Sequence, residues 1–232
     1  MISAASLKAA VESALSLTLS GPYSARAKPT DLYEAAMFTM MLRAAEHAGG
    51  TVFVTNDGLN SAVDARFRTS PGILSASSEY TYAVVTFPAT PTRHAQRVEV
   101  HLGIRFSGRS GICHECDIAM LTGAEADRVR AGRRSFPSSR ALITAVEAKL
   151  LTRGPGLEDG RNLLGLGTEF RLQKCRLVAP NSGAASLRRL FAYWPCQLSE
   201  NLIPGTAEAL KLEDDLRETI LEWLSRRRRR QL

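Results

Sequence analysis

The chain has 232 residues, of which 44% are hydrophobic and 23% are charged, and its formal net charge is +7 at pH 7. This length and composition are those of an ordinary soluble globular protein and exclude a disordered or fibrous one. No apolar run in the sequence is long enough to cross a bilayer, which excludes a membrane-spanning protein.

The first predicted element is a helix over residues 3–19. Its apolar part contains Lys8 and Glu12, which a secretory signal would not carry, so the segment is predicted to be an amphipathic helix. Four cysteines in a chain of this length do not form a disulfide framework. Both features predict a cytoplasmic location and no contact with membranes.

The next elements change from helical to extended. A second helix is predicted to begin near Pro29 and to end at Gly49-Gly50, because glycines are a common stop signal. Short segments rich in β-branched residues follow, and we predict strands at 51–55, 82–88 and 98–106. Two further strands are predicted at 111–121 and 141–151, separated by a polar stretch that is either a loop or a short helix.

The C-terminal elements alternate again. Helices are predicted at 157–170 and 186–194, a strand at 171–180, and a last helix from about 206 to the terminal arginines. This order predicts a mixed α/β fold in which a mixed central sheet is flanked by helices. Without repeats or linkers, residues 1–232 are predicted to be one domain. Its parts are an N-terminal helix at 1–20, a core at about 30–180, and a helical extension with an arginine tail at 181–232.

Three charged residues interrupt the two apolar strands at 111–121 and 141–151. Asp117 lies in the first strand, and Glu147 and Lys149 lie in the second. Residues two apart share one face of a strand, so Glu147 and Lys149 should project together. Buried carboxylates are usually paired or hold a metal, and two carboxylates on adjacent strands suit Mg²⁺. The pattern therefore predicts a phosphodiesterase site, with a structural salt bridge as the alternative.

The residues around these charges resemble a known family of nucleases. Three successive segments are similar to the PD-(D/E)xK superfamily of restriction-endonuclease-like folds: "SGICHECDIAML", "AVEAKLL" and "LEDGRNLLGLGTEF". In particular it resembles a bacterial subgroup with an H-E-x-D strand, an E-x-K strand and a following helix. The resemblance covers about residues 30 to 180, and it departs from the superfamily pattern in having no proline before Asp117.

The resemblance implies a Mg²⁺-dependent or Mn²⁺-dependent endonuclease that hydrolyses phosphodiester bonds, with DNA as the expected substrate. It implies that Asp117, Glu147 and the backbone carbonyl of Ala148 bind the metal, and that Lys149 assists the attacking water. Many members add an acidic residue from a helix that precedes the sheet, and Glu34 is the candidate here. A bacterial defence or restriction-type role is also implied, and a homodimer or an activating partner protein would fit it.

Several neighbouring residues allow two interpretations. Glu34 follows Asp31 by three residues, which also matches a helix capping box. Glu115 shares the face of Asp117 and could support the metal ligands without touching the metal, whereas His114 is expected to face away and pack in the core. Arg161 could contact a substrate phosphate or could simply be an exposed helical residue.

Alternatives to a nuclease also remain open. Five of the seven net charges come from the tail, which could bind nucleic acid or be only a solvated end; its residues are Arg226, Arg227, Arg228, Arg229 and Arg230. The same fold with a silent site would be a module that binds nucleic acid or a partner protein. A purely structural protein would expose Glu147 and Lys149 on an edge strand. Cys113 and Cys116 have the spacing of half a zinc site, but in a strand they would point to opposite faces, which favours two small buried hydrophobes.

Overall fold

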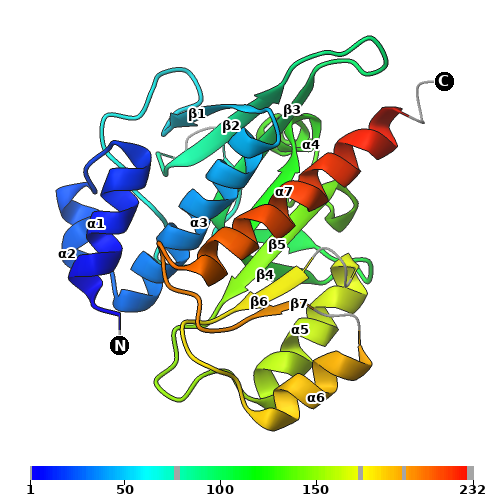
Figure 1. Ribbon diagram of the computed structural model, residues 1–232. Helices are drawn as coiled ribbons and strands as arrows, with labels where there is room; N and C mark the ends of the chain where they lie inside the picture. The colour runs from blue at the N-terminus through cyan, green and yellow to red at the C-terminus, as the bar shows by residue number, and fades with distance from the viewer. Residues whose placement is uncertain (1, 76–78, 172–174, 195–196, 229–232) are drawn as a thin grey trace.

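The computed structural model describes residues 2–75, 79–171, 175–194 and 197–228, and its seven strands form one sheet (Figure 1). The strands are β1 (Thr51–Thr55), β2 (Tyr82–Phe87), β3 (Gln96–Ser107), β4 (Cys113–Thr122), β5 (Leu142–Ala148), β6 (Cys175–Val178) and β7 (Gln197–Ser199). The helices are α1 (Ala4–Leu15), α2 (Gly21–Arg26), α3 (Pro29–His47), α4 (Gly123–Arg130), α5 (Leu157–Phe170), α6 (Ala185–Tyr193) and α7 (Ala207–Arg228). The predicted α/β class, with a mixed sheet flanked by helices, is confirmed.

The order of the strands in the sheet follows their order in the chain. Strands β1 to β5 pair antiparallel, whereas β5, β6 and β7 pair parallel. Antiparallel neighbours can be joined by a tight turn, but parallel neighbours need a crossover, and α5 and α6 provide the two crossovers. In the β4–β5 pair Ile118 lies opposite Val146, so Asp117 and Glu147 occupy adjacent positions on neighbouring strands.

Each face of the sheet is covered by its own layer of helices. Apolar residues of α1, α3 and α7 pack in one cluster on one face, and apolar residues of α4, α5 and α6 pack in a second cluster on the other. Helix α3 is buried almost all round, because it lies between the sheet and the helices α1 and α7. In Figure 1, α7 runs across the sheet beside α3.

The end of α3 follows the predicted stop signal. The helix ends at His47, and Gly49 adopts a φ of +87°, a left-handed conformation that glycine reaches without a steric penalty. The N–H of Gly50 then donates to the carbonyl of Ala45. The chain can therefore turn at once into β1.

Other boundaries differ from the predictions in informative ways. The polar stretch after β4 contains the short helix α4, which was one of the two alternatives. Strand β5 ends at Ala148, so Lys149 follows the strand, although its N–H still donates to the carbonyl of Val178 at 2.9 Å. Helix α2 and strand β7 have too few residues for a recognisable sequence period, and neither was predicted.

The residues after 180, predicted as a helical extension, pack against the core. Strand β7 adds to the sheet, and the α7 residues Leu212, Leu216 and Ile220 are buried in the same cluster as α3. Arg176 of β6 is also buried; it donates to the hydroxyl of Thr144 at 2.8 Å and to the hydroxyl of Thr219 at 2.6 Å. This side chain links β5 and β6 to α7.

Among the described residues, no helix combines the length and the apolar character needed to span a membrane. The longest helix, α7, carries charged side chains along its length.

Candidate active site

The predicted triplet comes together where β4 and β5 pair. A carboxylate oxygen of Asp117, Oδ2, accepts a hydrogen bond from the N–H of Ala148 at 2.8 Å. The Lys149 Nζ lies 3.6 Å from the same oxygen and 3.7 Å from Glu147 Oε2. The antiparallel register thus places two carboxylates and one ammonium group within contact distance, as the sequence pattern predicted.

The two carboxyl groups are electrostatically strained. Burial raises the pKa of Asp117, although the Lys149 charge and the Ala148 N–H both act against the shift. Burial, and then the charge of Asp117, raise the pKa of Glu147 well above its ordinary value. Burial alone would lower the pKa of Lys149, but the carboxylates of Asp117 and Glu147 raise it. One ammonium group therefore does not satisfy both acids.

Two further carboxyl groups, those of Glu34 and Glu115, are affected by the charge of Asp117. Burial, followed by the charge of Asp117, raises the pKa of Glu34 to about 8. Burial and the charge of Asp117 likewise raise the pKa of Glu115, which supports its predicted place beside Asp117. Glu34 does not cap α3, because the N–H of Lys28 donates to Asp31 Oδ2 at 2.7 Å instead. The capping interpretation of Glu34 is therefore wrong, and its side chain acts on the carboxylate cluster.

A cleft of about 430 Å³ opens beside these groups, between β4, β5 and α5. Clefts of this size commonly hold small ligands or substrate groups. The side chains at its wall include His114, Glu115, Glu147, Lys149, Asp159, Arg161 and Asn162. Arg161 is exposed on α5, and its place at the cleft fits the predicted contact with a substrate phosphate.

Three residues of the cleft were not expected there. His114 is half-buried and packs edge to face against Phe170, as expected of a residue packed in the core, yet it also lines the cleft. Asp159 and Asn162 come from the first turns of α5. The sequence could have indicated them, because their helix directly follows the E-x-K strand. The start of that helix must therefore lie at the end of the sheet where Lys149 lies.

Two alternatives from the sequence are not supported by the structure. Strand β5 lies between β4 and β6, so Glu147 does not sit on an edge strand. Cys116 is buried, as expected of a small hydrophobe, but Cys113 is exposed, which contradicts that interpretation. Cys196, the residue farthest along the chain among the four, lies outside the described residues.

Some of the carboxylate oxygens at the cleft are suited to bind a hard divalent cation. Glu147 Oε1 is buried and has no hydrogen-bond partner among the described residues, which leaves an acceptor for a cation. Across that same part of the chain, no group of three or more His, Cys, Asp or Glu side chains is arranged to hold a metal ion. Mg²⁺ commonly uses only one or two carboxylates and keeps several waters. Asp117 and Glu147 are therefore the side chains that would hold it, with Glu34 outside that pair.

Arg226, the residue of the arginine tail whose side chain the structure describes, lies far from the carboxylates. Helix α7 begins after β7, at the end of the sheet where Lys149 lies, and runs back along the sheet past Arg176 to Arg228. At about 1.5 Å per residue this helix is roughly 30 Å long. Arg226 is exposed and pairs with Glu222 at 2.5 Å. The side chains of Arg227 and Arg228 and the whole of Arg229 and Arg230 lie outside the described residues.

Ending the chain at Ser225 should weaken nucleic-acid binding without changing the fold. Removing five positive charges should make the slope of log affinity against log salt less steep by up to about 4.5, because fewer counterions are released. Folding should be unaffected, since Arg226 is exposed. Filter-binding titrations at several salt concentrations would test this. An unchanged affinity at low salt would show that the tail does not contact nucleic acid.

No family model, no curated protein and no solved structure matches this chain.

Proposed function

We propose that this protein is a nuclease that uses Mg²⁺ or Mn²⁺ to hydrolyse phosphodiester bonds, with DNA as its substrate. The observation that carries the proposal is the position of Lys149 Nζ, 3.6 Å from the Asp117 carboxylate and 3.7 Å from the Glu147 carboxylate, beside a cleft. The wider proposal is a restriction-endonuclease-like fold with a role in bacterial defence. The mixed sheet, with acidic residues on adjacent central strands, supports the fold.

The groups at the cleft suit phosphodiester hydrolysis. A divalent metal, when bound by Asp117 and Glu147, would supply a water of lowered pKa and charge neutralisation at the phosphate. Lys149 would hold the attacking water and place a fixed positive charge beside the phosphate, where negative charge develops. Arg161, at the same cleft, would bind a phosphate oxygen and orient the strand.

The balance of charge argues against a purely structural ion pair. The charge of Asp117 acts on Glu147, Glu34 and Glu115, and Lys149 is the cation that acts on all four. Arg105 offsets part of the charge of Glu115. A structural ion pair would have matched charges, whereas a surplus of carboxylates calls for a bound cation or for protons. A surplus of this kind is typical of functional sites.

Thermal melts of two amide variants test the proposal. Without metal, Asp117→Asn or Glu147→Gln removes repulsion between carboxylates, so each variant should melt at the same temperature as the wild type or higher. Mn²⁺ at a hundredfold excess over its dissociation constant should stabilise the wild type by about 2.7 kcal/mol, and the variants should lose most of this response. Glu158→Gln, at an exposed position of α5, is the matched control and should keep it.

A structural salt bridge predicts the reverse pattern. Glu147→Gln would then destabilise the protein, and Mg²⁺, Mn²⁺ and Ca²⁺ would leave the melting temperature of the wild type unchanged. If the metal response is present but the wild type cleaves neither DNA nor RNA, the nuclease assignment fails. The metal site would then belong to a binding module.

A further inference from the structure

A second charged cavity lies at the end of the sheet opposite the carboxylate cluster. It has a volume of about 670 Å³ and is bordered by the start of β3, the end of β4, helix α4 and the residues just before β5. Four arginines line it: Arg97, Arg128, Arg134 and Arg140. Since Asp117 and Thr122 lie five residues apart on β4, the two sites are separated by about 16 Å along the strand.

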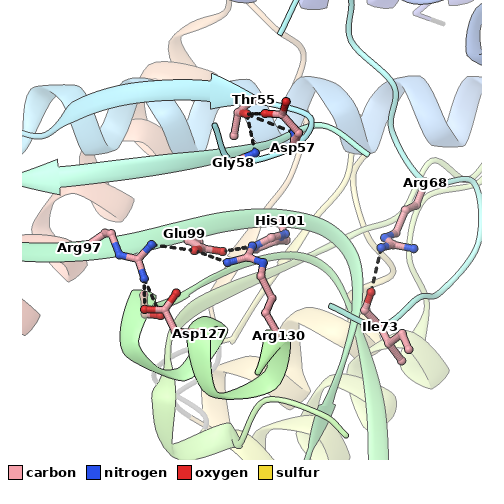
Figure 2. A network of polar contacts seen from close by, with 11 residues as sticks. Thr55, Asp57, Gly58, Arg68, Ile73, Arg97, Glu99, His101, Asp127 and Arg130 are labelled. Carbon is pink, nitrogen blue, oxygen red and sulfur yellow. Dashed lines mark hydrogen bonds and ion pairs between the residues drawn. The ribbon is translucent and has the colours of Figure 1, made fainter. Parts of the chain in front are cut away.

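The first of these arginines is held by a buried network. Glu99 of β3 is fully buried and accepts from Arg130 at 2.8 and 2.6 Å and from His101 Nε2 at 2.9 Å. Arg97 approaches the same carboxylate at 3.5 Å, and its other side pairs with Asp127. Figure 2 shows Arg97 between Glu99 and Asp127. The guanidinium group of Arg97 is thus fixed at the cavity wall.

Two more arginines are positioned by a second buried acid. Glu125 is almost fully buried, and its Oε1 accepts from the N–H of Ser138 at 2.9 Å. Arg128 lies 3.3 Å from its carboxylate and Arg134 lies 3.6 Å from it. Arg140 is exposed and forms no ion pair with any described residue. The acids thus orient the guanidinium groups but leave Arg140 free to bind a ligand.

The wall of the cavity carries an excess of positive charge. Its four arginines face two acidic side chains, Glu125 and Asp127, while its other polar groups, including Gln96 and Ser138, are neutral. A cation would be repelled by this wall, and an apolar ligand would leave the guanidinium groups without acceptors. The remaining class of ligand is an anion with several oxygen acceptors.

We propose that this cavity binds phosphate groups. The planar guanidinium fork matches the geometry of phosphate oxygens, and arginines already oriented by buried acids lose little side-chain entropy on binding. The cavity is large enough for a nucleotide, and it is open enough for a phosphate of a nucleic-acid backbone. Both ligands share the phosphate chemistry, so the experiment has to separate them.

The test measures binding in a chelating buffer, where no metal-dependent cleavage can occur. Inorganic pyrophosphate and a short DNA oligonucleotide are titrated separately into the wild type and into the double variant Arg134→Gln/Arg140→Gln. Each lost charge-assisted hydrogen bond should weaken binding roughly tenfold, so the double variant should bind roughly a hundredfold more weakly. Arg133→Gln is the matched control, because Arg133 is exposed nearby and does not line the cavity.

The two ligands distinguish the source of the phosphate. If the double variant loses binding of pyrophosphate but not of the oligonucleotide, the ligand is a free phosphorylated molecule. If it loses binding of the oligonucleotide but not of pyrophosphate, the ligand is a nucleic-acid backbone. The single variant Arg140→Gln repeats the test with the Glu125 ion pairs intact. The proposal is overturned if the wild type binds neither ligand, or if Arg133→Gln weakens binding as much as the double variant. Neither result bears on the carboxylate site.

Discussion

Alanine at Lys149 should lower the rate of Mn²⁺-dependent DNA cleavage by roughly a thousandfold, because it removes the fixed positive charge at the phosphate. Asp117→Ala and Glu147→Ala should abolish metal-dependent cleavage, since these side chains would hold the metal. Lys149 Nζ lies between both carboxylates, so the three side chains act as one unit. Single-turnover cleavage of a labelled duplex, with protein in excess, measures the effect on chemistry alone.

Two further variants make this expectation specific. Lys149→Arg should not restore cleavage, because the broad guanidinium group cannot replace a compact ammonium beside two carboxylates. Lys211→Ala removes an exposed lysine of α7 and should leave the rate unchanged. Robust cleavage by any of the alanine variants at Asp117, Glu147 or Lys149 would remove the proposed site.

Replacing Glu99 by glutamine should destabilise the protein by about 3 kcal/mol, because Arg130 and its neighbours would lose the buried carboxylate that pairs with them. Glu99 is fully buried and accepts two hydrogen bonds from Arg130 and one from His101. Tyr82 stacks on His101 at 4.8 Å, and Arg130 lies over the Tyr82 ring. Urea unfolding at pH 7 measures the loss.

The same carboxylate should make the wild type sensitive to acid. Burial acts to raise the pKa of Glu99, but the hydrogen bonds from His101 and Arg130 prevail and lower it to about 2. Because the folded pKa is below the unfolded value of about 4.3, this stability is present above about pH 4.3 and is lost as the pH falls toward 2. The difference corresponds to about 3 kcal/mol. Glu99→Gln should therefore have a flatter stability curve between these pH values.

A surface glutamate serves as the control for both measurements. Glu79 pairs with Arg66 at 3.2 Å, but its side chain is 82% exposed. Glu79→Gln should change stability by less than about 0.5 kcal/mol and should leave the acid limb of the curve unchanged. If Glu99→Gln is as stable as this control at pH 7, the buried network does not stabilise the fold.

The local pattern of the sequence was sufficient to predict which residues form the central part of the candidate site. Strand periodicity placed Glu147 and Lys149 on one face, and the apolar run around Asp117 identified a neighbouring strand. The structure pairs these two strands and brings the three charges together. The prediction succeeded because residues two apart on a strand share a face, and because the two apolar strands that carry the charges pair directly with each other.

The same reasoning, applied to β3, would have found the Glu99 network. Glu99 and His101 alternate with Val98, Val100 and Leu102, so two polar residues share one face of an apolar strand. The β-branched residues of this segment predicted the strand, but its two polar side chains were not recognised as a pair. What the sequence could not show is the partner, because Arg130 comes from α4, and no local period predicts where that helix packs.

Tertiary packing alone decided the remaining features. Glu34 acts on the carboxylates because α3 crosses the sheet at that point, whereas its sequence context equally suited a helix cap. Arg176 reads as an ordinary strand residue, and it is buried only because α7 folds back over β6. The direction of α7 likewise sends Arg226 away from Lys149. Sequence periodicity determines which face of an element is buried, but the position of one element on another depends on contacts between residues far apart in the chain.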